Sequence, residues 1–317
     1  MTGTDGTAPR RWSLSRGRVA AALAVLVAAL LVFHGAVPNR VGRLGSLLET
    51  YLPWCGSAVL PLLVVALVRR SGVALLALVL PVTAWLALFG GALLPDGSGA
   101  HDLTAVQHNV DDENPDPTGT AGALLAARAD LVALEELVPP ALSAYAAVLD
   151  PAYPHRALVG TVGLWSKYPL TDVRPVDIRP AGLGADWNRG LRATAATPKG
   201  DLAVYVAHLP SVRLGADGLR SARRDESAAL LGAALAAEPV RRVVLLGDLN
   251  ATVHDRGLGP VSARLGAPVP AFPFSWPAAL PVTRIDHILA RTATVTSLWT
   301  LPSTASDHVP VAARIRL

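Results

Sequence analysis

The chain has 317 residues, 51% of them apolar, with a mean hydropathy of +0.40 and a net charge of +4. Both apolar measures exceed those of an ordinary soluble domain, and the excess lies almost entirely in the first 94 residues. Those residues hold eight basic and two acidic side chains and carry a net charge of +6, whereas the remainder of the chain carries −2. The high isoelectric point of about 9.6 therefore does not indicate a basic surface that binds nucleic acid.

Three apolar runs dominate the start of the chain, namely residues 19–37, which are apolar apart from His34 and Gly35, residues 52–68 and residues 73–94. At a rise of about 1.5 Å per residue, each run is long enough as a helix to cross the roughly 30 Å of hydrocarbon in a bilayer. A cleaved signal peptide is the alternative for the first run, but two further runs follow it. None has the polar face of a helix buried in a soluble protein. The pattern predicts a tail over residues 1–18 and three transmembrane helices within 19–94.

Arginines indicate how these spans are oriented. Four arginines precede the first run, and Arg69 and Arg70 lie in the short connection between the second and the third. Because positive charges that flank transmembrane helices stay in the cytoplasm, we expect the N-terminal tail to be cytoplasmic. Three spans then place the chain after about residue 95 on the extracytoplasmic side. The expected location is the cell membrane, with the lipid bilayer as a partner, and no protein partner is implied.

The rest of the chain reads as a linker over residues 95–99 and one domain over residues 100–317. Short apolar runs alternate there with breaks rich in glycine and proline. The expected strands are Thr104–Val106, Leu131–Leu134, Leu158–Leu164, Leu202–Ala207, Val243–Leu246, Ile285–Ala290 and Val309–Leu317, and the expected helices are residues 120–129 and 220–237. The second helix carries Arg220, Arg223 and Arg224 on what we expect to be its solvated side. Strands and helices mixed without strict alternation predict a layered α/β domain.

Two of the expected strands run directly into carboxylates. Leu131–Leu134 ends in Glu135 and Glu136, although a strand that runs into a charged loop is common. Val243–Leu246 repeats the arrangement with greater specificity, because it ends in the sequence Gly-Asp-Leu-Asn at residues 247–250. The glycine lets the backbone turn closely, and the aspartate and asparagine offer an acceptor and a donor two residues apart.

Imidazoles and amides follow other strands. Asn109 comes after the first strand and His208 after the fourth, although a lone histidine in such a place is more often a satisfied surface residue. Asp307 and His308 are more informative, because an acid and an imidazole are adjacent just before the terminal strand. Strand ends are where layered folds gather their active sites. Together these side chains are of the types that a metal-assisted phosphoester hydrolase uses for catalysis.

The order of these motifs is similar to that of a known superfamily. Asn109, Glu136, His208, Gly247–Asn250, Ile285–His287 and Ser306–His308 occur in the order found in the endonuclease/exonuclease/phosphatase superfamily, which the domain therefore resembles. The resemblance covers residues 100–317 and includes Gly163–Leu170, which is similar to the family's Ser-Arg-Tyr-Pro segment. Three apolar runs before such a domain also resemble the architecture of the VanJ-type teicoplanin-resistance membrane proteins.

The resemblance implies a four-layered α/β/β/α sandwich, in which two β-sheets pack face to face with helices outside. It implies that Glu136 binds a divalent cation, Mg²⁺ or alternatively Mn²⁺, with Asn109 and Asp307 near the same site. Glu136 is preferred over Glu135 as the metal ligand, because in the family the ligand lies six residues after the aspartate that opens the strand, which is Asp130 here. Glu135 stands where glutamine is usual, and we expect it to add negative charge beside the metal.

The resemblance also implies catalytic roles. His308 would act on the attacking water or on the scissile phosphate, with Asp286 holding its imidazole in one tautomer. Asp248 and Asn250 would position the water and hydrogen-bond to the phosphoryl oxygens, while His208 would donate to a non-bridging oxygen or to the leaving group. Which of Asp248 and His308 is the base stays open at this point.

Two arginines are candidate substrate contacts. Arg189 and Arg192 lie in the segment Trp187–Arg192, and guanidinium groups pair well with phosphate. The alternative, that they are surface salt-bridge partners, has equal support. Val309 replaces the arginine that often follows the histidine in the family, so no phosphate contact is expected from that position.

The leading hypothesis is a membrane-anchored, Mg²⁺-dependent phosphoesterase with its active site outside the cell membrane. Its expected substrate is a lipid-linked phosphate or pyrophosphate of the cell envelope. The VanJ-like architecture implies a role in glycopeptide resistance. The first alternative is a membrane-tethered extracellular nuclease, although the net negative charge of the domain disfavours tight binding of nucleic acid. The second is a non-catalytic membrane sensor on the same fold, which is disfavoured because the acids, amides and imidazoles of the site are all present.

Overall fold

The computed structural model describes residues 12, 16–94, 99–216 and 218–317, so most of the predicted tail 1–18 and of the predicted linker 95–99 lies outside the described residues. The chain forms two compact units. The helical unit consists of the chain up to Val37 and of Tyr51–Leu93, and the sheet unit consists of Pro38–Thr50 and Leu94–Leu317. Residues 38–50 therefore group with the sheet unit, although they lie inside the predicted membrane region 19–94.

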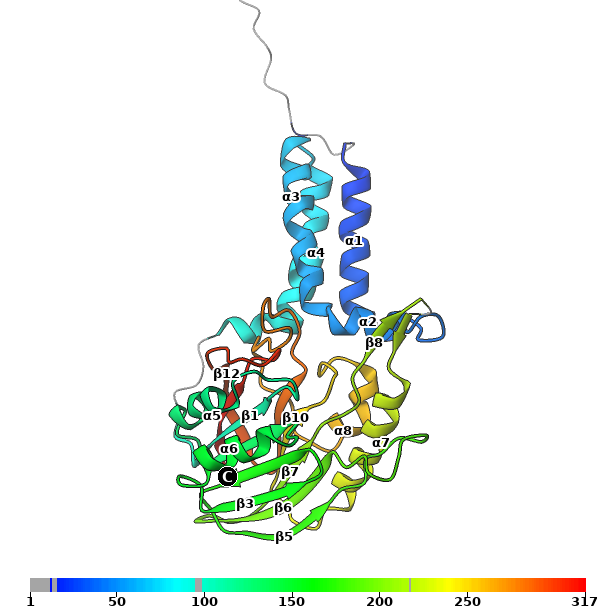
Figure 1. Ribbon diagram of the computed structural model, residues 1–317. Helices are drawn as coiled ribbons and strands as arrows, with labels where there is room; N and C mark the ends of the chain where they lie inside the picture. Colours follow the sequence, from blue (N-terminus) through cyan, green and yellow to red (C-terminus); the bar gives the residue numbers. More distant parts are fainter. Residues whose placement is uncertain (1–11, 13–15, 95–98, 217) are drawn as a thin grey trace, which may run out of the picture. The chain divides into compact units, whose positions relative to one another are not determined.

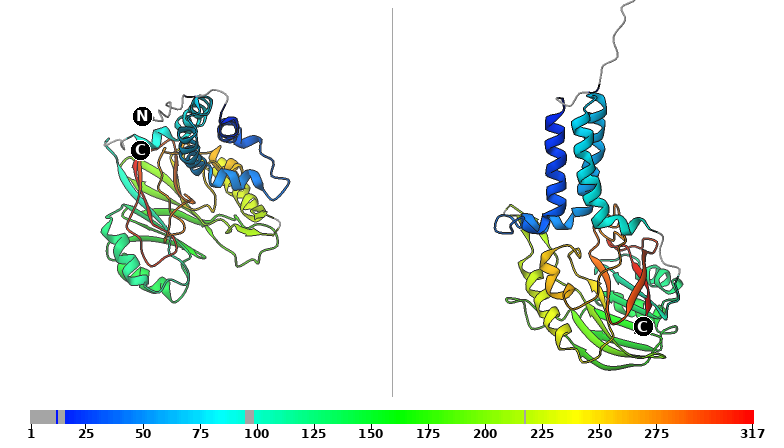
Figure 2. Two further views of the ribbon diagram at one scale, coloured as in Figure 1. Left: turned by 90° about the horizontal axis from the view of Figure 1, so that it is seen from above. Right: turned by 180° about the vertical axis from the view of Figure 1, so that it is seen from behind.

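The helical unit is built from apolar helices that pack side by side (Figures 1 and 2). Its elements are α1 (Arg18–Val32), η1 (His34–Ala36), η2 (Leu52–Ala58), α3 (Val59–Val68), α4 (Gly72–Phe89) and η3 (Gly90–Leu93). Ala24, Ala66 and Ala74 meet in its core, and such small side chains let helix backbones approach closely. Large aliphatic side chains, among them Leu60 and Leu76, are exposed on its surface.

The structure does not confirm three complete membrane spans. Among the described residues, Gly72–Leu93 alone is long and apolar enough by itself, with 22 residues and a hydropathy of 2.3. Leu52–Val68 reaches that length only together with Leu44–Thr50, from which a break separates it. Helix α1 has 15 residues, about 22 Å of helix against roughly 30 Å of hydrocarbon. The apolar runs at 19–37 and 52–68 were long enough in sequence, but part of each folds as 3₁₀ turns.

The sheet unit holds two β-sheets, with strand orders β12-β13-β1-β2-β4-β3 and β11-β10-β7-β6-β5. The strands of the first sheet are β1 (Leu103–Asn109), β2 (Leu131–Glu135), β3 (His155–Val159), β4 (Val162–Ser166), β12 (Thr294–Thr300) and β13 (Val311–Arg316). Those of the second are β5 (Leu170–Pro175), β6 (Gly190–Thr197), β7 (Gly200–Ala207), β10 (Val243–Asp248) and β11 (Asp286–Arg291). A separate hairpin is formed by β8 (Arg213–Gly215) and β9 (Gly218–Arg220).

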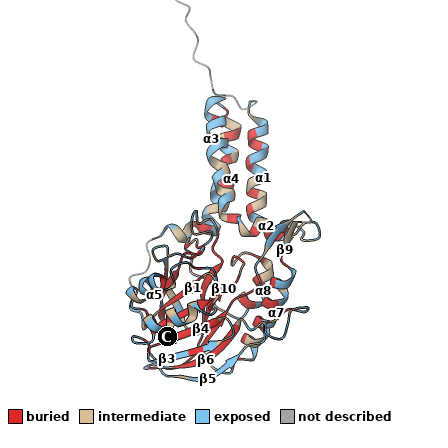
Figure 3. Ribbon diagram, in the orientation of Figure 1, coloured by how far each residue is buried: buried red, intermediate tan, exposed pale blue. Residues whose placement is uncertain are grey.

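The two sheets pack face to face. Apolar side chains from both, such as Leu131 and Val204, meet in one buried core. The helices α5 (Pro117–Ala126) and α6 (Ala141–Leu149) pack on the other face of the first sheet, and α7 (Ala222–Ala237) and α8 (Gly259–Ser262) on that of the second. Figure 3 shows buried strands between helices whose outer faces are exposed. The predicted four-layered α/β/β/α sandwich is confirmed.

Some strands differ from the predicted ones. The predicted strand Leu158–Leu164 is a hairpin, because β3 and β4 pair antiparallel around Gly160, whose φ of 55° lies in the left-handed region that glycine favours. Strands β5 and β6 are not predicted from the sequence. Strand β5 is exposed over most of its length, and β6 is built mainly from alanine and threonine, so neither shows an apolar run.

Parallel strand pairs bring the predicted site residues to one place. Strands β1 and β2 run parallel with Asn109 opposite Glu135, and β7 and β10 run parallel in the other sheet. The loops after these four strands therefore converge. Gly247 is required at the end of β10, because a Cβ there would collide with the carbonyl oxygen of Ala207 on β7.

Residues 38–50 are held in the sheet unit by buried polar contacts. Helix α2 (Leu44–Thr50) carries Glu49, which is 1% exposed and pairs with Arg256 at 2.8 Å between Oε1 and Nη2. The backbone N–H of Arg256, the first residue of η4 (Arg256–Leu258), also donates to Glu49 Oε2 at 3.0 Å. Ser46 Oγ donates to Asp255 at 3.0 Å. This segment is thus an integral part of the sheet unit.

Arg224 departs from its predicted place on the solvated side of α7. Its side chain is buried, pairs with Asp255 at 2.6 Å, and donates to the backbone carbonyl of Asn250 at 2.9 Å. Arg224 follows Arg223 in the sequence, but consecutive side chains lie about 100° apart around a helix, and the contact with Asp255 shows that Arg224 points inward. Through Asp255, the 38–50 segment supports the loop that carries Asn250.

We expect Glu49→Ala to lower the free energy of unfolding by about 2 kcal/mol, less than for a fully buried pair because Arg256 is partly exposed. The variant removes the carboxylate and with it the ion pair to the Arg256 guanidinium. The measurement is thermal unfolding of the full chain in detergent. In a double-mutant cycle, Glu49→Ala and Arg256→Ala should be strongly non-additive. Additive effects would show that the two side chains do not interact.

Candidate active site

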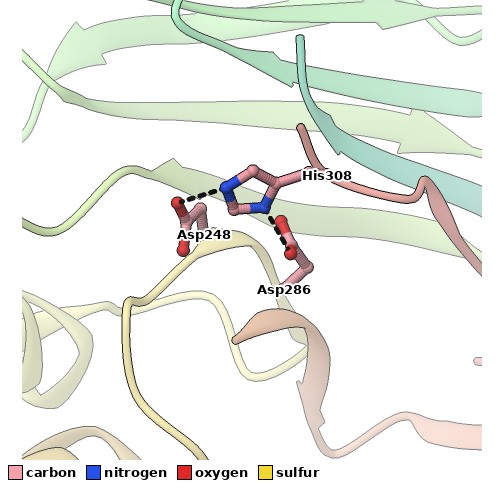
Figure 4. A group of neighbouring side chains, drawn as sticks. All are labelled: Asp248, Asp286 and His308. Atoms are coloured by element: carbon pink, nitrogen blue, oxygen red, sulfur yellow. Dashed lines mark hydrogen bonds and ion pairs between the residues drawn. The ribbon is translucent and has the colours of Figure 1, made fainter. Parts of the chain in front are cut away.

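His308 lies between two carboxylates (Figure 4). Its Nδ1 is 2.8 Å from Oδ2 of Asp286, and its Nε2 is 3.8 Å from Oδ2 of Asp248. Asp286 opens β11 and Asp248 ends β10, and the two residues are directly opposite each other in that antiparallel pair. The backbone N–H of His308 donates to Ser306 Oγ, which donates to the carbonyl oxygen of Asn109. The loop before β13 is thus fixed to the end of β1, and His308 with it.

The two carboxylates hold the imidazole in its charged form. Burial alone would lower the pKa of His308, but the charges of Asp286 and Asp248 outweigh it and raise this pKa to about 10. Burial alone would raise the pKa of Asp286, and the contact with His308 outweighs it and lowers that pKa. Asp286 therefore stays ionised and accepts the Nδ1 proton, so that Nε2 faces the site. The orienting contact expected from the sequence is present.

Asp248 and Asn250 are positioned by the backbone between them. The N–H of Asn250 donates to Asp248 Oδ1 at 2.9 Å, and Asn250 Nδ2 donates to Asp248 Oδ2 at 3.2 Å and to the carbonyl oxygen of Leu209 at 2.9 Å. Asn250 has a φ of 48°, a conformation uncommon for residues other than glycine. Burial raises the pKa of Asp248, which makes it a better proton acceptor than an exposed carboxylate.

His208 is a buried neutral imidazole. Burial and the neighbouring charge of Arg189 hold its pKa well below the usual range. Nη1 of Arg189 lies 3.1 Å from His208 Nδ1 and 3.4 Å from His208 Nε2. Since the guanidinium can only donate, the shorter contact favours the tautomer in which Nδ1 accepts and Nε2 carries the proton. That Nε2 lies 3.6 Å from Asp248 Oδ2 and 3.7 Å from Glu136 Oε1. His208 therefore presents an N–H donor to the site, and Arg189 orients it.

A second acidic cluster adjoins the histidines. Asp111, Asp112 and Glu136 have carboxylate oxygens within 4.8 Å of one another, an oxygen-rich set of the kind that Mg²⁺ and Mn²⁺ prefer. Asn109 Nδ2 connects this cluster to the catalytic one, because it donates to Glu136 Oε1 at 3.1 Å and to Asp248 Oδ2 at 3.2 Å. The donor set fits a hard divalent cation, with Glu136 as a central member.

Asp307 lies at the edge of this arrangement. Its side chain is 58% exposed, with Oδ1 at 3.9 Å from His308 Nε2 and Oδ2 accepting from Trp276 Nε1 at 3.4 Å. Neither of the two metal-ligating clusters found among the described residues includes Asp307. The structure thus brings Asp307 to His308, but it does not group it with Glu136.

The sequence matches the Endonuclease/Exonuclease/phosphatase family over residues 106–308, well over half of the chain. This chain belongs to that family. Members of the family are typically metal-dependent hydrolases of phosphoesters. No curated protein sequence matches the chain.

Solved structures of similar fold cover about two thirds of the chain. Sphingomyelinase C from Streptomyces griseocarneus is 22% identical, with a TM-score of 0.51 over 70% of this chain and 99% of that one. Humanized TDP2 from D. rerio is 18% identical, with a TM-score of 0.55 over 68% and 99%. A mutant of beta toxin from Staphylococcus aureus with bound magnesium ions is 16% identical, with a TM-score of 0.52 over 67% and 99%. At these identities the likeness shows the fold alone.

Arg192 is not a substrate contact in this member of the family. Its side chain is 2% exposed and pairs with Glu238 at 2.8 Å and with Asp172 at 2.5 Å. Glu238 also accepts from Tyr205 at 2.7 Å, so the pair belongs to a buried network on the outer face of the second sheet. The predicted role in substrate binding is wrong, because partners distant in sequence occupy the guanidinium.

Glu135 does not add the expected negative charge beside the metal. It is fully buried at the end of β2, and burial, with the nearby charge of Asp286, raises its pKa well above the usual range. Its Oε2 accepts from Gln107 Nε2 at 2.7 Å, and its Oε1 has no hydrogen-bond partner among the described residues. The same Nε2 donates to Asp286 Oδ1 at 3.0 Å. Glu135 is thus a neutral acid that shares a donor with the orienting carboxylate.

We expect Glu135→Gln to make the protein more stable than wild type at pH 8 and about equally stable near pH 4. The unfolded chain ionises Glu135 above its ordinary pKa of 4.5 while the folded chain keeps it neutral, so the wild type loses up to about 1.4 kcal/mol per pH unit as the pH rises toward the folded pKa. Glutamine cannot ionise. Thermal unfolding of the full chain with EDTA across this range measures the difference, and parallel pH profiles would contradict it.

Three residues of the site were not predicted from the sequence. Gln107 links Glu135 to Asp286, and nothing in a strand sequence marks it as facing the site. Asp111 and Asp112 directly follow the first strand, so the rule that acids gather at strand ends could have found them. The histidines adjacent to site residues are structural: His108 contacts Thr304 at 2.9 Å, and His287 donates to the carbonyl oxygen of Ala251 at 2.7 Å.

Proposed function

We propose that this protein is a membrane-anchored, divalent-metal-dependent phosphoesterase whose active site faces the extracytoplasmic side. Its substrate is a lipid-linked phosphate or pyrophosphate of the cell envelope. The observation that carries the proposal is that one chain joins a complete acid, amide and imidazole site to apolar helices with exposed aliphatic surfaces. A protein anchored in a membrane meets lipid substrates at high local concentration.

A divalent cation, Mg²⁺ or Mn²⁺, would be held by Glu136 and Asn109 with Asp111 and Asp112, and Asp307 would join from the edge of the site. The cation supplies neutralisation of the phosphate charge, which otherwise repels the attacking oxygen. The chain's own contribution is a set of acceptors already gathered and oriented, since Asp112 N–H donates to Glu136 Oε2 at 3.1 Å and fixes its carboxylate. Such preorganisation keeps the reorganisation cost of the reaction low.

Proton transfer and charge stabilisation fall to different residues. His308 is charged and faces the site through Nε2, so it donates to a phosphoryl oxygen and stabilises the negative charge there. Asp248 lies opposite this nitrogen and has a pKa raised by burial, which suits it to accept the proton of the attacking water. His208 donates through Nε2, and Asn250 holds Asp248 in place.

The membrane location, with the N-terminus in the cytoplasm, follows from the arginine distribution and is part of the proposal. The order of apolar runs and catalytic domain supports a relationship to the VanJ-type teicoplanin-resistance proteins, and with it a role in glycopeptide resistance. Removal of the protein from a resistant host should then lower its resistance to teicoplanin, and a plasmid copy encoding His308→Ala should fail to restore it.

The substrate is tested with the full chain in detergent, because residues 38–50 belong to the sheet unit and a fragment that starts at residue 95 would lack them. Undecaprenyl pyrophosphate, undecaprenyl phosphate and plasmid DNA are offered separately with Mg²⁺. We expect phosphate release from a lipid substrate and little nicking of DNA. Nicking without lipid hydrolysis, abolished in Asp248→Ala, would replace the proposal with the nuclease alternative.

A further inference from the structure

A pocket lined by arginines lies in the sheet unit, and the proposed reaction assigns it no function. Its volume is about 870 Å³. Six arginines line it, namely Arg40, Arg43, Arg189, Arg213, Arg220 and Arg223, and none of the described residues that line it is acidic. They come from the 38–50 segment, the loop before β6, the β8–β9 hairpin and the start of α7.

The pocket is a built feature of the fold. The N–H of Leu219 on β9 donates to the carbonyl oxygen of Gly42 at 3.0 Å, and a Cβ at Gly218 would collide with Gly42. Arg43 is anchored by Asp225 of α7 at 2.7 Å. Two segments that are far apart in the sequence are therefore held against each other, and their arginines are held around one hollow.

The positive charge of the pocket is poorly compensated. Arg40, Arg213 and Arg223 have exposed side chains and form no ion pair with any acid in the part of the chain that the structure describes. Like charges gathered around a hollow repel one another, and an anion that enters relieves the repulsion. Ser221 and Ala222, at the N-terminus of the 16-residue helix α7, also line the pocket and add the positive end of the helix dipole.

The pocket adjoins the catalytic residues through one side chain. Arg189 lines the pocket and at the same time donates to His208, whose Nε2 lies beside Asp248 and Glu136. An anion that contacts Arg189 in the pocket would therefore share this side chain with His208 of the active site. A ligand with two linked phosphates could occupy both places at once.

We propose that the arginine pocket binds the non-scissile phosphate of a diphosphate ester, so that the substrate class of this site is a pyrophosphate. This inference rests on the proposed phosphoesterase function. The oxygen of water attacks the terminal phosphorus, the bond from that phosphorus to the bridging oxygen breaks, and the bridging oxygen leaves with the inner phosphate. The products are inorganic phosphate and a monophosphate ester, and the arginines stabilise the charge on the leaving phosphate.

Apolar side chains in the lining of the pocket suit an amphiphilic diphosphate. Leu183, Trp187 and Leu219 line the pocket together with its arginines. Apolar groups beside a cationic lining match the two parts of a lipid pyrophosphate, its apolar chain and its charged head. A water-soluble diphosphate has the same charged head but no apolar chain to contact these side chains.

The test is calorimetric binding of inorganic pyrophosphate and of inorganic phosphate to the full chain in detergent, with EDTA present and at one fixed ionic strength. We expect pyrophosphate to bind at least about tenfold more tightly than phosphate, and Arg213→Ala/Arg223→Ala to weaken pyrophosphate binding about 30-fold or more, because each charged hydrogen bond contributes about tenfold. Arg264→Ala, an exposed arginine outside the pocket, is the matched control and should bind as wild type does. Thermal unfolding checks that each variant is folded.

Equal affinity of wild type and the double variant, or no preference for pyrophosphate over phosphate, would overturn the proposal. An equal loss in Arg264→Ala would show general charge attraction and overturn it too. Displacement of pyrophosphate by undecaprenyl pyrophosphate identifies the lipid as the source of the head group, and failure of that displacement identifies a soluble diphosphate. If arginine-dependent binding is found but no lipid is hydrolysed, the proposed function fails while the pocket assignment stands.

Discussion

His308→Ala is expected to lower kcat for phosphate release by about a thousandfold or more, and also to lower the free energy of unfolding, because a buried ion pair loses one partner. The variant removes the charged donor that faces the phosphate, and loss of such a group typically costs a factor of about 100 to 10,000. Its carboxylate partner Asp286 then lies buried without a cation. The measurement is single-turnover phosphate release by the full chain, so that product release does not mask the chemical step.

The matched control is His155→Ala, a histidine on strand β3 that belongs to neither cluster of the site. This variant should retain the activity of wild type. Asp286→Asn adds a second readout, because loss of the carboxylate lowers the pKa of His308 and should shift the alkaline limb of the pH profile to lower pH. An active His308→Ala variant, or an unshifted profile, would remove His308 from the mechanism.

The second large effect is expected for Glu136→Gln, which should weaken Mg²⁺ binding by about 100-fold and lower activity in parallel at limiting Mg²⁺. Glu136 is the central carboxylate of the second cluster, where it contacts Asn109 and Asp112. Isothermal calorimetry with Mg²⁺ and Mn²⁺ measures the affinity without any need for substrate. High Mg²⁺ should restore part of the activity.

Glu113→Gln is the control for that comparison. Glu113 lies in the same loop as Asp111 and Asp112 and is exposed, but it is not a member of the cluster. Both variants remove one negative charge from the same region, so general electrostatic weakening would affect them alike. Equal metal affinity in Glu136→Gln and Glu113→Gln would show that Glu136 is not a ligand.

Much of the candidate site could be predicted because its side chains follow buried strands. Asp248 and Glu136 stand directly after apolar runs, and in a layered fold the ends of parallel strands converge. The short polar motifs that follow these apolar runs therefore predicted which side chains gather in the candidate active site. Their pairing across the two sheets, such as Asn109 with Asp248, depends on how the sheets face each other and needed the structure.

Other features depend on partners distant in sequence and could not be predicted from local pattern. Arg192 and Arg224 carry the same charge as the pocket arginines, but Glu238 and Asp255 draw them into the interior. The charge of Glu135 likewise follows from burial at a strand end and not from its residue type. Three membrane spans were predicted from apolar length alone, and length in sequence does not reveal where 3₁₀ turns such as η2 interrupt a helix.

The segment 38–50 shows the same limit at the scale of domains. Apolar runs flank it on both sides, so its position in the sequence assigns it to the membrane region. Glu49, Ser46 and Arg43 instead contact residues of the sheet unit that lie about two hundred positions later. A loop between hydrophobic helices can thus belong to the domain that follows them.

We propose that this site hydrolyses a lipid-linked phosphoester with the help of a divalent metal. The most direct measurement is release of inorganic phosphate from undecaprenyl pyrophosphate by the full chain in detergent, with Mg²⁺, with EDTA, and with His308→Ala beside wild type. We expect release by wild type with Mg²⁺, and none above background with EDTA or in the variant. No release by folded wild type with Mg²⁺ or Mn²⁺, or equal release by His308→Ala, would contradict it.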